Sequence, residues 1–436
     1  MLIEIKKAGI NGEGIGFYKR KPVFVEGCYP NETIDCKLYD EGSHYRGELI
    51  KVIKKSEFRV KVPCIHQKRC GGCALMSVSY DEQLRIKKQL LESALLKYMH
   101  RKIDVGDVVP SDKQLFYRNK CNLPVIEKDG RLINALYAPN SNHPVYIDSC
   151  MIHEQIVEEI RKEVLNVLNR HKYKVYDHHL KKGIRQIVIR GFENEYQLVL
   201  ITGNDKIDDK TIEDLNKIDN LVSIFQGINT HKNPVNMMPD NLRKLSGKDK
   251  INVKINSFRL KLSPQAFFQL NKSQAEQIYS DVNNLIDSKV NCLVEAYCGI
   301  GAMSLSMHDK ADELYGIEIV DKAIRDAKDN ARINKIDNIT YICGDASYEV
   351  RKLSKNKKID VLIVDPPRTG LDDDLLVTIL KSKIKKVIYV SCNPSTLAKN
   401  LDILSDKYQI DYIKGYDMFP NTPHVEAIVL LCRAEC

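Results

Sequence analysis

The stretch YVSCNPSTLAKNL, residues 389–401, places a cysteine where an apolar run ends and a new element begins. The run before it, IKKVIYV, is rich in β-branched residues and predicts a buried strand. Asn393 is a good helix N-cap, and Pro394 suits the first helical position. We therefore expect Cys392 at the carboxyl end of a strand, facing the positive end of a helix. That environment favours the nucleophilic thiolate; the alternative interpretation is a small buried hydrophobic side chain.

This turn belongs to a region, from about 256 to 436, that alternates strands and helices throughout. The strand-like runs are VNCLVEAY, ELYGIEIV, ITYICGDA, IDVLIVDPP, KKVIYVSC and EAIVLLCR, with helical stretches such as DKAIRDAKDNARINK between them. The alternation predicts an α/β fold with an open, mostly parallel, doubly wound sheet. Ligands of such sheets bind beyond the carboxyl ends of the strands. Those ends carry Tyr297, Glu318, Asp345, Asp365 and Cys392.

The first of these strands turns through EAYCGIGAMSL, a glycine turn that predicts a nucleotide cofactor. Gly299 and Gly301 allow a close backbone approach, but Ser304 stands where a dinucleotide fingerprint has its third glycine. Glu318 is placed to accept two ribose hydroxyls, and Asp345 to accept the exocyclic amine of adenine. S-adenosylmethionine fits this pattern better than NAD. Each acid alone could instead be a helix cap or a solvated turn.

Two further segments bear on the reaction. In IVDPPRTGL, Asp365 is followed by two prolines and then Arg368, where methyltransferases acting on the adenine amine have an aromatic residue. The segment FPNTPHVEAIVLL supplies the carboxylate of Glu426. A thiol at Cys392 and a carboxylate at Glu426 indicate a chemistry other than methylation of an exocyclic amine.

The region from 60 to 255 opens with a cluster of cysteines in CIHQKRCGGCALMS. Cys64, Cys70 and Cys73 follow the spacing C-x5-C-x2-C, and the Gly-Gly pair lets the backbone fold tightly around an ion. Three thiols at this density predict a metal site, either Zn²⁺ or an iron–sulfur cluster.

A fourth ligand for that site has to come from elsewhere. Cys150, in YIDSCMIHEQIV, is expected to begin a helix and is the first choice, with Cys121 as the other nearby cysteine. His66 and His153 keep a mixed zinc site open. The rest of the region predicts an α+β scaffold, with an amphipathic helix and the strands GIRQIVIRGF and EYQLVLITG.

Residues 1–59 are short alternating runs punctuated by glycine, which predict a small β-barrel. Basic residues lie beside aromatic ones, a pattern that suits single-stranded nucleic acid; the alternative is a solvated basic surface. The residues concerned are Lys6, Lys7, Lys19, Arg20, Lys21, Lys51, Lys54 and Lys55, with Phe17, Tyr18, Tyr39 and Tyr45.

The amino-acid composition and net charge predict the cellular compartment and the kind of binding partner. The 436 residues are 43% hydrophobic and 29% charged, as in soluble globular proteins with two or three domains. No leader or membrane-spanning run is expected, so we predict a cytoplasmic protein whose thirteen cysteines are thiols, metal ligands or catalytic groups. The net charge of +9 fits a polyanionic partner.

The motifs AYCGIG, VDPPRTG, YVSCNPSTLAKNL and TPHVEAIVLL, together with four cysteines and a TRAM-like N-terminal barrel, resemble the RNA uracil-5-methyltransferase family. The resemblance covers almost the whole chain, and its nearest branch acts on 23S ribosomal RNA. It implies a Rossmann-like S-adenosylmethionine-dependent methyltransferase domain over 256–436, a central α+β iron–sulfur domain over 60–255 and an RNA-binding barrel over 1–59. It also implies a monomer with ribosomal RNA as partner, and neither DNA nor membrane.

Residue by residue, the resemblance implies a nucleophile, a base, a cofactor site and a cluster. Cys392 is the implied nucleophile and Glu426 the implied general base, with His424 the next choice as base. Ala302 departs from relatives that have asparagine near the methionine moiety. The implied cofactor residues are Gln269, Tyr297, Glu318, Asp345 and Asp365; the implied [4Fe–4S] ligands are Cys64, Cys70, Cys73 and Cys150.

The chemistry gives an independent reason for the thiol. Carbon 5 of uracil is a poor nucleophile until a thiolate adds to carbon 6 and produces an enolate. After methylation a general base must remove the proton on carbon 5 before the thiol can leave. The uracil ring must also leave its stack in the RNA to meet both protein groups. The alternatives are a transfer RNA substrate, or an iron–sulfur RNA-binding protein that has lost catalytic activity.

Overall fold

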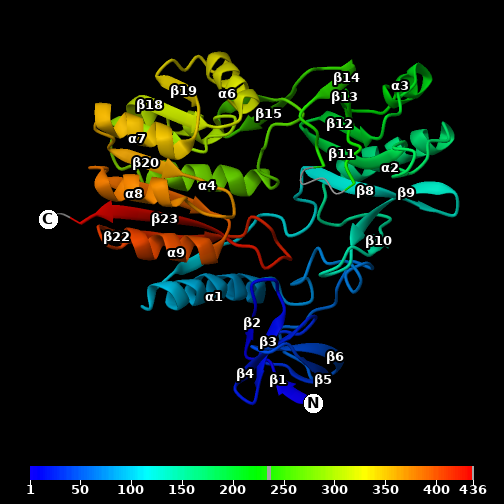
Figure 1. The fold of residues 1–436 in the computed structure, drawn as a ribbon, viewed down its shortest axis with the longest axis horizontal. Coiled ribbons are helices and arrows are strands. Elements are labelled where there is room, and N and C mark those ends of the chain that lie inside the picture. Colours follow the sequence, from blue (N-terminus) through cyan, green and yellow to red (C-terminus); the bar gives the residue numbers. More distant parts are fainter. Residues whose placement is uncertain (233–236, 435–436) are drawn as a thin grey trace.

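The chain folds into three sheet-based parts, which the computed structural model describes over residues 1–232 and 237–434. A large mixed sheet with helices on both faces forms the left of Figure 1. A second sheet lies at the upper right, and the N-terminal sheet hangs below both. The C-terminal region therefore has the predicted α/β architecture.

The large sheet, called here the catalytic sheet, has eight strands in the order β19-β18-β17-β20-β21-β23-β22-β7. Pairing from β19 through β21 is parallel, whereas β23 runs antiparallel to both β21 and β22. The strands are β7 (Gly106–Val109), β17 (Val290–Ala296), β18 (Ala311–Glu318), β19 (Ile339–Cys343), β20 (Val361–Val364), β21 (Lys386–Ser391), β22 (Tyr408–Tyr416) and β23 (Glu426–Arg433). The six strand-like runs read from the sequence are all present, and β7 and β22 are additional.

Helices cover this sheet on both faces, so it is doubly wound as expected. One buried apolar cluster joins α4, α5, α6 and the hairpin β15–β16 to the sheet, and a second joins α1, α7, α8 and α9 to its other face. The bounds are α1 (Tyr80–Met99), α4 (Lys272–Asn284), α5 (Ala302–Ser306), α6 (Asp321–Ile333), α7 (Ala346–Asn356), α8 (Asp373–Lys381), α9 (Pro394–Leu404), β15 (Ile251–Ile255) and β16 (Phe258–Leu262), with a 3₁₀ turn at His308–Lys310.

The second sheet has seven strands in the order β10-β9-β8-β11-β12-β13-β14, with α2 packed against it. Its elements are β8 (Lys120–Lys128), β9 (Arg131–Tyr137), β10 (Pro144–Tyr146), α2 (Gln155–Arg170), β11 (Ile184–Phe192), β12 (Glu195–Thr202), α3 (Asp209–Leu215), β13 (Leu221–Ile228) and β14 (Leu242–Gly247). The expected helix begins at Gln155, so Cys150 lies in the turn before it and does not begin it.

The residues expected to form a small barrel form a six-stranded sheet in the order β1-β5-β6-β4-β3-β2. It has its own apolar core, which includes Ile3, Val23, Val25 and Ile34. The strands are β1 (Leu2–Glu4), β2 (Lys7–Ala8), β3 (Gly14–Tyr18), β4 (Lys21–Val25), β5 (Thr33–Asp40) and β6 (Tyr45–Lys54).

Two elements from the middle of the chain belong to the catalytic sheet. Strand β7 adds to its edge by pairing in parallel with β22, and α1 packs against α9 and β7. The segment that follows the N-terminal sheet is therefore fastened to the C-terminal third of the chain. Within the described residues, no helix combines the length and the apolar character needed to span a membrane.

Candidate active site and cysteine cavity

The parallel pairing brings the predicted polar residues to one edge of the catalytic sheet. Ala296 lies opposite Ile317 on β18 and Val364 on β20, and Val364 in turn lies opposite Tyr389 on β21. Strands in register end together. The residues at or just beyond these ends are Tyr297, Glu318, Asp345, Asp365 and Cys392.

Cys392 lies in the predicted strand-to-helix turn. The Asn393 side chain caps α9 by accepting a hydrogen bond from the Ser395 backbone N–H at 3.1 Å, and Pro394 is the first helical residue. The same turn holds the VDPPRTG loop, because Asn393 Nδ2 and Thr396 Oγ1 donate to the Arg368 carbonyl oxygen at 2.9 and 3.2 Å. The loop of Asp365 and the loop of Cys392 therefore form one unit.

Glu426 enters this unit from the antiparallel strand β23. Ser391 pairs with Ala427, so Cys392 and Glu426 are neighbours at the ends of adjacent strands. Glu426 is 4% exposed. Burial raises the pKa of its carboxyl group, and the negative charge of Asp365 raises it further while Arg368 opposes the change. Burial also raises the pKa of Asp365. A carboxyl group with a raised pKa is a stronger base once ionised.

The thiolate expected from the helix N-terminus is not the resting form of Cys392. Burial, followed by the charges of Glu426 and Asp365, raises the pKa of the thiol to about 11, and Arg368 offsets only part of this. Desolvation and two nearby carboxylates outweigh the helix dipole. Cys392 is therefore a protonated thiol at neutral pH, and it must lose its proton before its sulfur can act as a nucleophile.

His424, the alternative base, packs edge-on against Phe419, with ring centroids 6.2 Å apart. Burial lowers the pKa of its imidazole to about 4, and the positive charges of Arg368, Lys87 and Arg118 add to this shift. An imidazole with so low a pKa is a weak base. Glu426, whose pKa is shifted upward, is the stronger of the two.

Glu318 lies among the residues that the sequence predicts to bind the cofactor, at the carboxyl end of β18. Its carboxylate accepts hydrogen bonds from the Gly299 N–H at 3.2 Å and the Val320 N–H at 2.9 Å. Tyr297 has a φ of +67°, a left-handed backbone that turns the chain sharply after β17. Burial and the charges of Asp372, Asp345 and Glu318 raise the pKa of Tyr297 to about 12. Asp345 itself accepts from the Tyr348 N–H at 2.9 Å as the N-cap of α7.

Gln269, the remaining predicted cofactor residue, lies on a loop that is hydrogen-bonded to the second sheet. Arg190, which is buried, donates to the carbonyl oxygens of Ala266 and Ser263 at 2.5 and 2.7 Å. Asn119 Nδ2 donates to the Gln269 carbonyl oxygen at 2.9 Å. The second sheet thus positions a loop that borders the catalytic sheet.

Glu295, on β17, was not anticipated as part of the site. Its side chain is 2% exposed and accepts a hydrogen bond from the Ser304 hydroxyl. Burial raises the pKa of Glu295 to about 8, and the charge of Asp365 adds to the shift. The signal in the sequence was an acid inside the apolar run VNCLVEAY. Because Ser304 occupies the place of the third glycine, this bond also explains that departure from the dinucleotide fingerprint.

The four predicted cysteine ligands line one cavity of about 90 Å³. Cys64, Cys70, Cys73 and Cys150 share its wall with His66, His153 and Arg118, among others. Within residues 1–232 and 237–434, however, no three His, Cys, Asp or Glu side chains are arranged closely enough to hold a metal ion.

The two alternatives for the fourth ligand are placed differently. Cys121 is 1% exposed in the apolar core of the second sheet and does not line the cavity. Cys150 does line the cavity. Burial acts to raise the pKa of the Cys150 thiol, but the hydrogen bond and the charge of His153 lower this pKa overall. His153 Nδ1 in turn lies 2.7 Å from Glu158 Oε1.

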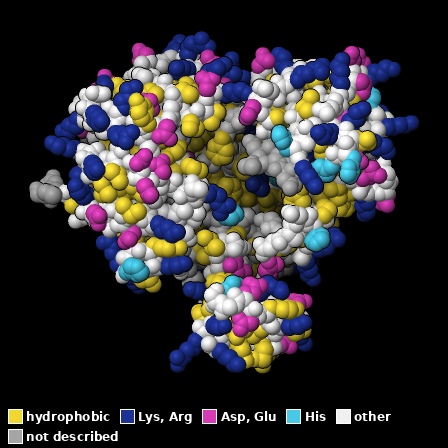
Figure 2. Space-filling view, in the orientation of Figure 1, with side chains coloured by type: hydrophobic (Ala, Val, Ile, Leu, Met, Phe, Trp, Pro, Cys, Tyr) yellow, Lys and Arg dark blue, Asp and Glu magenta, His cyan; other side chains and the backbone are white. Residues whose placement is uncertain are grey.

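The space-filling view shows a deep hollow between the catalytic sheet and the second sheet, with the N-terminal sheet below its mouth. Hydrophobic side chains gather within it, and Lys and Arg side chains rim much of the surrounding surface (Figure 2). A glycine turn followed by carboxylates at successive strand ends of a doubly wound sheet is the arrangement of an α/β protein that binds a nucleotide cofactor.

Comparison with known proteins gives the family. The chain belongs to the tRNA (uracil-5-)-methyltransferase family, whose model matches residues 79–434. It is therefore an RNA uracil-5-methyltransferase that uses S-adenosylmethionine, as the motifs predicted.

Two relatives illustrate how far the similarity extends. An uncharacterized RNA methyltransferase of Bacillus cereus is 37% identical over 442 residues, covering 99% of this chain and 96% of the relative. The crystal structure of a Pyrococcus abyssi tRNA (uracil-54, C5)-methyltransferase with S-adenosyl-L-homocysteine matches with a TM-score of 0.79 and 26% identity, covering 99% of this chain and all of that one.

The raised pKa of Cys392 predicts its reactivity. With a pKa of about 11, only about 0.1% of the thiol is ionised at about pH 8. Alkylation by iodoacetamide, followed by peptide mass spectrometry, should be slower at Cys392 than at the exposed Cys343, and its rate should rise about tenfold per pH unit. Glu426→Gln should speed alkylation of Cys392 at about pH 9, because one negative charge is removed. A rapid, pH-independent reaction would contradict the assigned pKa.

Proposed function

We propose that the chain transfers a methyl group from S-adenosylmethionine to carbon 5 of a specific uridine in 23S ribosomal RNA, through a covalent adduct with Cys392. The observation that carries the proposal is the pairing of β21 with β23, which sets a thiol beside a buried carboxyl group of raised pKa. One group can add to the uracil ring while the other moves protons on the same ring.

The reaction balances with these residues. The Cys392 thiol gives its proton to the Asp365 carboxylate as Sγ bonds to carbon 6, and the ring electrons move onto the carbonyl oxygen at carbon 4; Asp365 returns this proton to the thiolate when it leaves. Carbon 5 then takes the methyl group, and the carbon–sulfur bond of the cofactor breaks to give S-adenosylhomocysteine. Glu426 removes the remaining proton from carbon 5, the carbon 5–carbon 6 double bond re-forms and the thiolate leaves.

The cofactor would lie against the edge formed by Tyr297, Glu318 and Asp345, with Gln269 and Asp365 between it and the uracil. Glu318 is held by two backbone N–H groups, so its position is fixed before any ligand binds. Fixed carboxylates suit the ribose hydroxyls of a nucleoside. The loop of Gln269 lies between β16 and α4 and is hydrogen-bonded to the second sheet, whereas the loop of Asp365 follows β20 of the catalytic sheet.

Substitution of the two reacting groups should separate their roles. Cys392→Ala should abolish methyl transfer and form no protein–RNA adduct, because the first addition cannot occur. Glu426→Gln keeps the nucleophile, so a methylated adduct should accumulate and survive denaturing electrophoresis with label from the cofactor methyl group. A thermal melt of each variant controls for folding. A well-folded Glu426→Gln protein that turns over normally would contradict the assigned role.

Transfer RNA is the second candidate substrate. The solved relative named for uracil-54 of transfer RNA aligns over its entire length, so architecture alone does not favour ribosomal RNA. The preference for 23S ribosomal RNA rests on the resemblance of the motifs. Incubation of each RNA, taken from cells that lack this protein, with labelled cofactor tests the choice directly.

We propose a [4Fe–4S] cluster as the occupant of the cysteine cavity, with Cys64, Cys70, Cys73 and Cys150 as ligands. Four thiols line the cavity, and thiolates are the ligands of such clusters. The contribution of the cluster would be to join the segment of Cys64–Cys73 to the turn before α2.

Metal analysis tests this site. Protein purified without oxygen should contain iron and sulfide at about four each per chain, and Cys70→Ser should lose most of both. Cys121→Ala is the matched control, because that cysteine lies outside the cavity and its replacement should leave the iron content unchanged. Zinc at one equivalent without sulfide would contradict a cluster.

The N-terminal sheet is the proposed RNA-binding module. Lys37 and Arg46 lie over the Tyr39 ring at 5.0 and 4.3 Å, and Lys21 lies over Tyr45 at 5.4 Å. Cations that lie over half-buried aromatic rings at the surface suit the phosphates and bases of a single strand.

Removal of charges from this sheet should weaken binding in a salt-dependent way. Lys19→Ala, Lys21→Ala and Lys37→Ala together should lower the slope of log affinity against log salt by about 2, if each neutralises one phosphate. The matched control replaces Lys352 and Lys355 on α7 and Lys358 in the loop after it, all of which are exposed. An unchanged slope in the first variant would show that the N-terminal sheet is structural only.

A further inference from the structure

The connection between β22 and β23, residues 417–425, ends immediately before Glu426 and is held by residues from outside the catalytic sheet. Lys87 on α1 and Asp417 form an ion pair in which both side chains are fully buried. Lys87 Nζ also donates to the Phe419 carbonyl oxygen at 3.0 Å. One lysine, 330 residues earlier in the chain, thus fixes two points of the connection.

A second pair of contacts holds the middle of the connection. Gln83 Oε1 accepts from the Asn421 backbone N–H at 2.8 Å, and Gln83 Nε2 donates to Asn421 Oδ1 at 3.2 Å. Asn421 Nδ2 donates to the Gln114 carbonyl oxygen at 2.7 Å. The Leu75 N–H, two residues after the cysteine ligand Cys73, donates to the Asn421 carbonyl oxygen at 2.9 Å.

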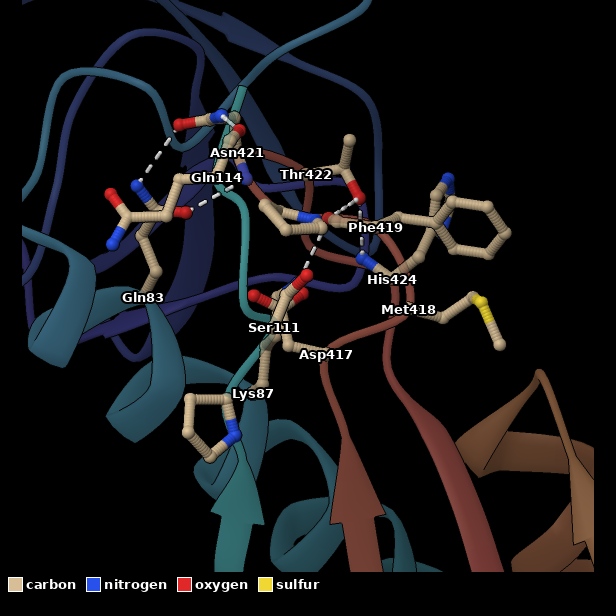
Figure 3. A network of polar contacts seen from close by, with 12 residues as sticks. Gln83, Lys87, Ser111, Gln114, Asp417, Met418, Phe419, Asn421, Thr422 and His424 are labelled. Atoms are coloured by element: carbon tan, nitrogen blue, oxygen red, sulfur yellow. Dashed lines mark hydrogen bonds and ion pairs between the residues drawn. The ribbon is translucent and has the colours of Figure 1, made fainter. Parts of the chain in front are cut away.

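These contacts continue along the connection as far as His424 (Figure 3). The Thr422 hydroxyl donates to the Phe419 carbonyl oxygen at 2.8 Å, and the His424 N–H donates to the Thr422 hydroxyl oxygen at 3.3 Å. Glu426 follows two residues later as the first residue of β23. The position of the base is therefore set from α1 through a chain of hydrogen bonds.

Stability alone does not account for this arrangement. Helix α1 already packs on the catalytic sheet through Leu91, Ala94, Leu95 and Met99. A buried ion pair is often no more stabilising than apolar side chains of the same volume, whereas it constrains geometry more strictly. Charged groups at Lys87 and Asp417 are better explained by placement of the connection than by cohesion of the fold.

We propose that Gln83, Lys87 and Asp417 are positioning residues for the elimination step, which hold Glu426 against the methylated adduct. The inference rests on the proposed function, because it needs a base at Glu426 and an adduct at Cys392. Addition and methyl transfer use Cys392, Asp365 and the cofactor, whereas removal of the proton from carbon 5 uses Glu426. Release of the product alone should depend on these three residues.

The test uses the full-length protein, labelled cofactor and 23S ribosomal RNA or transfer RNA from cells that lack the protein. Gln83→Ala removes two bonds to Asn421 without leaving a buried charge. The pair Lys87→Met/Asp417→Leu replaces both charges with apolar side chains of similar size, so folding is preserved. In both variants the methylated adduct should form at about the wild-type rate and decay about 10- to 100-fold more slowly, as displacement of a base by about 1 Å predicts.

The matched control is Gln226→Ala, which removes a buried glutamine of the second sheet that donates to Thr202 Oγ1 and the Asp205 carbonyl oxygen at 2.8 and 2.5 Å. It should lower the melting temperature without slowing adduct decay. If the variants at Gln83 and at Lys87 and Asp417 release product as fast as this control, the inference is overturned. A wild-type protein that methylates neither RNA would overturn the proposed function, and the inference with it.

Discussion

Parallel pairing of β17, β18, β20 and β21 is the constraint on which the site depends. Because the four strands run in register, their carboxyl ends fall along one edge and every loop that leaves them can face the same ligand. The antiparallel strand β23 then brings Glu426 to that edge from the opposite chain direction. A thiol and a base 34 positions apart in the sequence become neighbours without a long loop.

Acidic side chains gathered at one edge of the sheet raise the pKa values of the groups beside them, and the proposed reaction uses these raised values. Asp365 and Glu426 are close enough that burial and mutual repulsion raise the pKa of the pair, and they raise the pKa of the Cys392 thiol as well. Substrate must therefore enter a site whose nucleophile still carries its proton and whose carboxyl groups can accept one. Arg368, on the loop bonded to the turn of Cys392, opposes the shift for both the thiol and Glu426.

Much of this could be predicted from the sequence, for identifiable reasons. Strand ends and glycine turns are local features, so the positions of Glu318, Asp365 and Cys392 followed from patterns of a few residues. The cysteine spacing likewise predicted that Cys64, Cys70 and Cys73 lie together. Cys150, 77 residues further on, was a candidate beside Cys121 until the family resemblance favoured it, and the structure places Cys150 in the same cavity wall.

Other features depend on contacts that no local pattern records. Strand β22, YQIDYIKGY, alternates weakly, and β7 joins it across about 300 residues of chain. Lys87 stands among lysines and glutamates in α1 and resembles a solvated position, yet it is fully buried against Asp417. The prediction of a thiolate at Cys392 was wrong. The helix N-terminus can be read from the sequence, but the burial of the thiol beside two carboxyl groups, which raises its pKa, cannot.

The central claim is that Cys392 makes 5-methyluridine in RNA, and the most direct measurement maps that nucleoside in the cell. Ribosomal and transfer RNA would be analysed by nuclease mapping and mass spectrometry from cells that lack the protein, and from the same cells given either the wild type or Cys392→Ala. The account predicts that 5-methyluridine disappears from a defined site in 23S ribosomal RNA and returns only with the wild type. Its loss from transfer RNA alone would reassign the substrate. Unchanged 5-methyluridine in both RNAs, or full restoration by Cys392→Ala, would contradict the account.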